Sequence, residues 1–378
     1  MADVGDLVAR DSAVYQEFAR LYQLARDLRP TGTDRWSGNL YATPGGSWGG
    51  YNPSTGDIRL SGPLVLRHLV DPSSTAQERA EAIATVLHEA THAGMAVDAP
   101  NEPNAVRTEH SIGAIEGFAE LRTMSDFDLY AAQAGYPELK LRKPQYPGAF
   151  AAMDSLAEQA SGPAKDRDAF IAEGTRGPGV MHFDQLADGV VRNRLAEVVP
   201  FHEEHRRAVR AALIGAMLHR GWPVLKHMPA ETGVTIAGEI RQKLNSKVDE
   251  IRRHYRASPG EVFPVDAPNA QVGRERVLDR AKGGAGPRRQ VDGAGRAGSA
   301  KTGPGNTGPR NTGPGNTGPG NAVAGKGDPG VGHPSLRFLS GQAGAAGAVR
   351  GRPVLGDGAR GRGTGGGPGQ GRGEPERG

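Results

Sequence analysis

Hydrophobic residues recur at helical spacing through most of the chain between residues 3 and 257. Apolar side chains three and four positions apart line one face of a helix, and several long stretches show this spacing. The pattern predicts helices over residues 3–28, 75–97, 105–122, 148–161, 165–174, 181–198, 203–220 and 235–257. Thr75 with Glu78 three residues later is a capping-box signature, which indicates where the second helix begins.

The segment from residue 36 to residue 61 follows a different pattern. Short apolar runs around Tyr41, Tyr51 and Ile58 are separated by glycines, and Asn-Pro-Ser-Thr-Gly at 52–56 favours a turn. We therefore expect one small β-sheet or hairpin ahead of the helix at 75–97. The predicted fold class is α+β, mainly α.

The C-terminal part has the composition of a disordered chain. Gly and Pro are so frequent past residue 281 that no stretch buries enough apolar surface to offset the entropy of ordering. Residues 302–321 are consecutive five-residue units, Thr-Gly-Pro-Gly-Asn or Thr-Gly-Pro-Arg-Asn, without the spacing of collagen. We expect a folded domain over 1–265, with a core at about 36–125 and a helical part at about 145–258. A disordered low-complexity tail is expected over 266–378.

Charge separates the same two parts of the chain. Residues 281–378 hold 14 Lys and Arg against 5 Asp and Glu, whereas residues 1–280 hold 32 against 37. Arg360, Arg362 and Arg372 each precede a glycine, as in segments that bind RNA weakly. Weak binding of RNA or an acidic partner is thus an expectation for the tail, not for the folded part. The oligomeric state is left open.

Residue types that are missing exclude several classes of protein. The chain has no cysteine, which removes disulfides, cysteine nucleophiles and thiolate metal sites. No apolar stretch approaches the ~20 residues of a membrane span. The first residues lack the basic and apolar regions of a Sec signal peptide. We expect a cytoplasmic protein without a membrane partner, unless a non-classical route exports it.

One short motif points to metal chemistry. His88-Glu89-Ala90-Thr91-His92 is an H-E-x-x-H string inside the helix predicted at 75–97. Histidines at positions i and i+4 project from the same helix face, so both imidazoles can reach one metal ion. Glu89 lies about 100° around the helix, where it can contact a water on the metal more easily than the metal itself.

A third ligand is available on the next predicted helix. Residues 115–120 read Ile-Glu-Gly-Phe-Ala-Glu, with Glu116 placed 24 residues after His92. An H-E-x-x-H string followed by a Glu-Gly-Phe-Ala segment resembles the gluzincin metallopeptidases. The resemblance covers residues 85–120. The spacing is a few residues longer than in thermolysin-like or aminopeptidase members, and Ile115 stands where they have a polar residue.

The resemblance implies a zincin-like fold and a catalytic Zn²⁺. The zinc ligands would be His88, His92 and Glu116, with the fourth position open. It further implies that Glu120 orients a ligand imidazole. Gly117 would let the two helices approach each other closely.

The resemblance also implies hydrolysis of peptide bonds in a peptide or protein substrate. Glu89 would be the general base toward a metal-activated water. An extended substrate would pair with an edge strand within residues 49–61. Tyr130 and Tyr136 follow the second helix and are candidate donors to a developing oxyanion, a task that gluzincins often give to a later Tyr or His.

Other ligand assignments stay open at this point. Asp98 lies six residues after His92, the offset used by snapalysin-like enzymes, although Met95 stands where they have a glycine. His110 can also reach inward from the start of the second helix. His202 and His205 are a further pair, which a solvated helix face explains equally well.

Two functional classes compete. The first is a zinc-dependent peptidase, acting inside or at the end of a chain, whether or not it is delivered as an exported effector or toxin. The alternative is a catalytically idle zincin-like binding or scaffold protein whose basic tail carries the interaction. The presence of Glu89 favours the enzyme, because a purely structural metal site has no use for a carboxylate beside the open position.

Overall fold

The computed structural model describes residues 5–265 of the chain. These residues form a mainly helical α+β fold with one four-stranded sheet, which confirms the predicted fold class. Residues 1–4 and the tail predicted over 266–378, including its repeats at 302–321 and its RNA or acidic partner, lie outside the described residues. No helix within 5–265 has the length and apolar character that a membrane span needs.

The small sheet is mixed rather than a simple hairpin. Its strands are β1 (Asp6–Leu7), β2 (Leu40–Thr43), β3 (Gly49–Tyr51) and β4 (Ile58–Ser61), in the order β1-β2-β4-β3. β2 and β4 are parallel, while the other two pairs are antiparallel. The hairpin predicted at 36–61 is confirmed for β3 and β4, and β3 is an edge strand of the sheet.

The first strand corrects the helix predicted over residues 3–28. Helix α1 (Ala13–Leu28) begins only after Ser12, whose hydroxyl accepts a hydrogen bond from the backbone N–H of Tyr15 at 3.3 Å. The residues before it pair with β2, and Val8 N–H donates to the carbonyl of Leu40 at 2.9 Å. Pairing with a distant strand overrides the helical spacing of these residues, and local pattern cannot reveal it.

Two long helices carry the H-E-x-x-H string and the Glu-Gly-Phe-Ala segment. They are α3 (Ala76–Gly94), which begins with the predicted capping box of Thr75 and Glu78, and α4 (His110–Gln133). The other α-helices are α2 (Arg67–Val70), α5 (Pro147–Ala160), α6 (Arg167–Arg176), α7 (His182–Val190), α8 (Glu203–Met217) and α9 (Ala230–Ala257). Short π and 3₁₀ turns are η1 (Gly62–Leu66), η2 (Gly179–Met181), η3 (Val191–Leu195) and η4 (Trp222–His227).

Helix α4 begins and ends later than the predicted range of 105–122. Val106 N–H donates to the carbonyl of Val180 at 2.8 Å, and this pairing keeps the preceding loop out of the helix. At the other end Phe127 and Tyr130 continue the buried face, until Gly135 adopts a φ of 95°. A glycine in this conformation is a common end to a helix.

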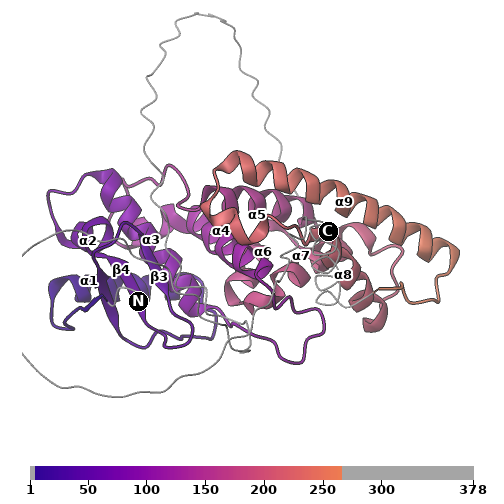
Figure 1. The fold of residues 1–378 in the computed structure, drawn as a ribbon, viewed down its shortest axis with the longest axis horizontal. Helices are drawn as coiled ribbons and strands as arrows, with labels where there is room; N and C mark the ends of the chain where they lie inside the picture. Colours follow the sequence, from indigo (N-terminus) through magenta and orange to yellow (C-terminus); the bar gives the residue numbers. More distant parts are fainter. Residues whose placement is uncertain (1–4, 266–378) are drawn as a thin grey trace, which may run out of the picture. The chain divides into compact units, whose positions relative to one another are not determined.

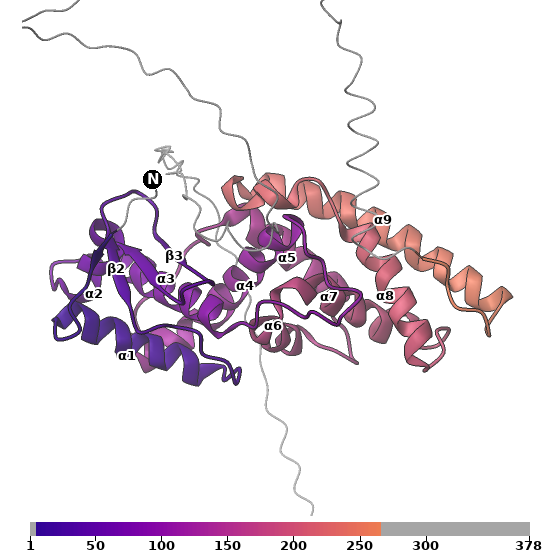
Figure 2. The same cartoon turned by 60° about the horizontal axis from the view of Figure 1, so that its bottom comes forward.

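The position of α4 places it in two hydrophobic cores. Its first half, including Phe118 and Leu121, packs in a cluster with residues of α5 to α9. Its second half, including Phe127 and Tyr130, packs in a cluster with α1, α3 and the sheet. Figures 1 and 2 show α3 and α4 side by side, between the sheet and the later helices. Side chains that project from α3 toward the first half of α4 therefore lie where the two cores meet.

Candidate metal centre

The H-E-x-x-H string lies in the buried C-terminal half of α3. His88, Glu89 and His92 are only 1%, 3% and 7% exposed. Their helical spacing places both imidazoles on the same face, with ring centroids 4.7 Å apart. The expected i, i+4 geometry is thus present in a dry environment.

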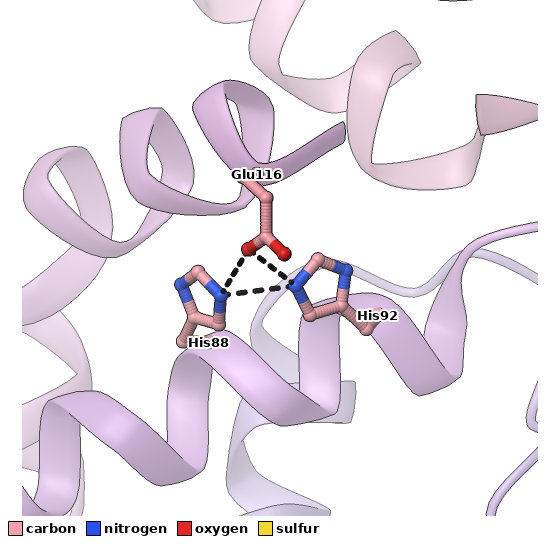
Figure 3. Close-up of side chains that lie close together, drawn as sticks. All are labelled: His88, His92 and Glu116. Atoms are coloured by element: carbon pink, nitrogen blue, oxygen red, sulfur yellow. Dashed lines mark hydrogen bonds and ion pairs between the residues drawn. The ribbon is translucent and has the colours of Figure 1, made fainter. Parts of the chain in front are cut away.

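Glu116 completes a group of three from the neighbouring helix α4. Its Oε2 atom lies 3.3 Å from His88 Nε2 and 3.4 Å from His92 Nε2, and the two Nε2 atoms are 2.9 Å apart. Figure 3 shows the carboxylate pointing down from α4 at the two rings. Within the described residues, these three side chains form the one cluster of His and carboxylate groups that could hold a metal ion.

The spacing of the three donor atoms fits a metal ion of the size of zinc. The donor atoms lie 2.9 Å, 3.3 Å and 3.4 Å from one another, close to the roughly 3.3 Å expected between two ligand atoms that each lie about 2.05 Å from one zinc ion. Two imidazoles and one carboxylate are also a donor set that zinc favours when no thiolate is available.

Glu120 contacts His88 at its other ring nitrogen, Nδ1. Its Oε1 lies 3.0 Å from His88 Nδ1, although the N–H direction does not meet hydrogen-bond geometry. The other oxygen, Oε2, accepts a hydrogen bond from the backbone N–H of Gln145 at 3.1 Å. Glu120 therefore lies beside the His88 ring and also contacts the segment that leads into α5.

Burial and mutual contact shift the pKa values of this group in opposite directions. Burial by itself lowers the pKa of His88, but the contacts with Glu116 and Glu120 outweigh it and raise that pKa well above its usual value. Burial by itself raises the pKa of Glu116, but the two histidines hold it well below its usual value. Without a metal the group is thus a buried ion pair, and a metal that binds must displace a proton.

Glu89 is the unpaired member of the string. Burial, together with the nearby carboxylates of Glu116 and Glu120, raises its pKa against the opposing influence of the two histidines. Its Oε2 atom is buried without a hydrogen-bond partner in the described part of the chain, and so is Nδ1 of His92. A buried polar atom without a partner is costly, so these atoms point to a water or another group at this position.

A small pocket opens at these side chains, and we call it the site pocket. It is lined by Gly49, Gly50, Tyr51, His88, Glu89, His92, Glu116 and Tyr146. The space open to the centre of a water molecule is about 10 Å³, which is room for about one water.

The edge strand β3 forms one wall and approaches Glu89 very closely. A Cβ atom added at Gly49 would lie 2.8 Å from Glu89 Oε1 and 2.8 Å from Leu60 Cδ2. In an antiparallel pair, every second residue bonds to the neighbouring strand through its backbone, and the residues between point away from that strand. The N–H of Ser61 donates to the carbonyl of Trp48, and the N–H of Asn52 donates to the carbonyl of Asp57, which shows that Trp48 and Asn52 face β4. The N–H and C=O groups of Gly49 and Tyr51 consequently point away from β4, toward the open edge.

Tyr146 also lines the site pocket, and the sequence did not single it out. It lies just ahead of α5, and its ring centroid is 5.3 Å from that of His88. Burial, with added repulsion from Glu116, Glu89 and Glu120, raises the pKa of its phenol well above the usual value, so the group stays a proton donor. No motif spacing links Tyr146 to α3, because tertiary packing alone brings the two together.

The two tyrosines proposed from the sequence as oxyanion donors lie elsewhere. Tyr130 is fully buried, and its hydroxyl donates to the carbonyl of Leu21 at 3.0 Å. Tyr136 stacks beneath Arg79, with its hydroxyl 3.5 Å from Glu17 Oε1. Neither lines the site pocket, because helix α4 runs on past Glu116 and carries both away from it.

The alternative ligands are also kept apart from the group of three. The Asp98 side chain is 49% exposed and pairs with Arg107 at 3.1 Å. His110 Nδ1 lies 2.9 Å from the hydroxyl of Thr108. His205 Nδ1 contacts the hydroxyl of Tyr255 at 3.1 Å, and the ring centroid of His202 lies 6.3 Å from that of His205.

The role expected of Gly117 needs correction. A Cβ atom at this position would meet Met153 Cβ at 2.8 Å and the carbonyl of Ala149 at 3.0 Å, both on α5. The glycine therefore allows α4 to approach α5 rather than α3. Residues that follow each other on a helix face different neighbours, and the spacing within the motif does not say which.

Comparison of the chain with protein-family models, with curated proteins and with solved structures found no match.

Proposed function

We propose that this chain is a zinc-dependent peptidase whose metal ligands are His88, His92 and Glu116. The observation that carries the proposal is the carboxylate of Glu89. It is buried and unpaired beside the group of three, and it faces the edge strand β3. A site that only held the fold together would have no use for that carboxylate.

Bound zinc would supply Lewis acidity, polarising a carbonyl oxygen and making a water easier to deprotonate. Glu89 takes the proton from the attacking water and passes it to the leaving amine. The raised pKa of Glu89 favours the first of these transfers, because a more basic carboxylate accepts a proton from water more readily. Glu120 keeps the His88 ring in place during the reaction.

Tyr146 takes the role that the sequence suggested for Tyr130 or Tyr136. Its phenol is protonated, and the residue lines the site pocket together with Glu89 and the group of three. A hydrogen bond from this hydroxyl to the oxygen of the tetrahedral intermediate would stabilise the developing charge.

The edge strand β3 supports an extended peptide as the substrate. Among residues 5–265 no strand pairs with the outward edge of β3, so the backbone groups of Gly49 and Tyr51 can accept an extended peptide, and Gly49 lies directly against Glu89. The pocket itself has room for about one water, so the strand pairing would hold the peptide along β3, beside the pocket.

The small size of the pocket favours a second candidate, a binding or scaffold protein that holds a metal without turning over a substrate. Substitution at Glu89 separates the two. In an enzyme this residue controls turnover, whereas in a scaffold its loss has no functional effect.

The test combines metal analysis with turnover of unstructured protein substrates such as casein. We expect about one zinc per chain in the wild type and strong loss of zinc in Glu116→Ala. Glu89→Gln should keep the zinc and lose turnover by about 10²-fold to 10⁴-fold. Asp98→Ala is the matched control and should behave as the wild type. Full zinc in Glu116→Ala, with loss of zinc in Asp98→Ala, would show that the ligand assignment is wrong.

A further inference from the structure

A lysine from a distant segment reaches the outer oxygen of Glu116. Lys226 lies on η4, and its Nζ atom is 3.8 Å from Glu116 Oε1, while Glu116 Oε2 faces the two histidines. The lysine side chain is only 10% exposed. Among residues 5–265, Glu116 is the one carboxylate within ion-pair distance of this ammonium group. The two oxygens of Glu116 thus have separate neighbours.

The backbone around Lys226 is held firmly in place. Trp222 and Leu225 on η4 are fully buried. The carbonyl oxygen of Trp222 would lie 2.1 Å from a Cβ atom at Gly113, so η4 packs directly on the backbone of α4. Lys226 therefore lies on a segment that packs closely against α4.

The charges around the pocket explain why a cation is useful here. Three buried carboxylates, from Glu89, Glu116 and Glu120, converge on this group. A divalent metal balances two of the three formal charges. Lys226 can balance the third, and an unbalanced charge in a buried site is costly.

We propose that Lys226 is a positioning residue that occupies Oε1 of Glu116, so that this carboxylate presents only Oε2 to the metal. The inference rests on the metal centre of the proposed function. A carboxylate that binds through one oxygen leaves a coordination position open, whereas one that binds through both would fill it. Lys226 thereby keeps the metal accessible at a cost in affinity, because its charge competes with the metal for the same carboxylate.

The test uses the full chain and measures metal binding rather than activity. Lys226→Met removes the charge and keeps the length of the side chain, while Lys226→Arg keeps the charge. Lys140→Met is the matched control, because Lys140 forms an exposed pair with Asp128 at 2.8 Å. Zinc affinity is measured by competition with a chelator, and the coordination number by the visible absorption of the protein loaded with Co²⁺.

Removal of the charge should tighten zinc binding by about ten-fold, since Glu116 is released to the metal. The Co²⁺ absorption of Lys226→Met should fall about two-fold, as expected when a four-coordinate site gains a ligand. Lys226→Arg and Lys140→Met should match the wild type. A purely structural role predicts the opposite sign, which is weaker zinc binding.

Wild-type affinity and absorption in Lys226→Met would overturn the proposal, and so would weaker zinc binding with an unchanged Co²⁺ spectrum. Circular dichroism checks the fold, and Lys226→Gln repeats the measurement if the Met variant does not fold. A wild type that binds neither metal refutes the proposed metal centre itself, which is a distinguishable result.

Discussion

Replacing Gly49 by alanine would place a methyl group between the edge strand and Glu89. The new Cβ atom would lie 2.8 Å from both Glu89 Oε1 and Leu60 Cδ2, whereas ordinary contact begins at about 3.4 Å, so each neighbour must retreat by about 0.6 Å. Leu60 is fully buried and has little room to move, which leaves the carboxylate to shift. Overpacking of this kind costs about 1–3 kcal/mol of stability. A misplaced general base should also lower kcat by about 10-fold to 100-fold.

The assay compares three quantities in Gly49→Ala and wild type: melting temperature, zinc content and turnover. We expect the melting temperature to fall by roughly 2–12 °C. Zinc content should be unchanged, because the methyl group does not touch the three ligands. Gly46→Ala, in the loop just before β3, is the matched control, since no atom lies within 4 Å of its added Cβ. Wild-type kcat in Gly49→Ala, at full zinc content, would refute the reasoning that β3 positions Glu89.

Two further predictions concern a buried histidine and the tyrosine in the wall of the pocket. Burial lowers the pKa of His182 from 6.5 to about 4, and the unfolded chain therefore binds a proton between these pH values that the folded protein does not. The free energy of unfolding should therefore fall by about 3 kcal/mol between pH 6.5 and pH 4 because of this histidine. Urea unfolding at several pH values should show this fall in the wild type and a smaller one in His182→Gln, and an equal dependence on pH in both proteins would contradict the prediction. Tyr146→Phe should lose about 10²-fold in kcat with little change in KM or zinc content, while Tyr136→Phe serves as the control with wild-type kinetics. Turnover that survives in Tyr146→Phe would remove the tyrosine from the mechanism.

Local features of the sequence were sufficient to predict much of helix α3. The capping box of Thr75 and Glu78 forms as predicted, and the i, i+4 spacing of His88 and His92 places both rings on one face. These features depend on contacts within one or two helical turns, which any chain with this local sequence makes. The same reasoning succeeded for the hairpin of β3 and β4, where a short turn joins the strands.

Several features that depend on distant segments were wrong or missing, although Glu116 on α4 does join the two histidines as predicted. The residues of β1 have helical spacing but pair with β2, and Tyr130 has a suitable position in the chain but packs into the core under α1. Tyr146 and Lys226 line or flank the site without any signal in their spacing. Their places follow from how α5 and η4 pack on α4, and that packing is a property of the whole hydrophobic core.

By itself, then, the sequence determined the two imidazoles, the carboxylate between them and the helix that carries all three, because helical geometry relates residues a few positions apart. Only the tertiary structure decided that Glu116 faces this pair, that Gly49 lies against Glu89, and that a phenol and an ammonium group adjoin the site. The physical reason is the range of the interactions. Hydrogen bonds within a helix are set locally, whereas the direction of a side chain between two helices is set by close packing of segments far apart in the chain.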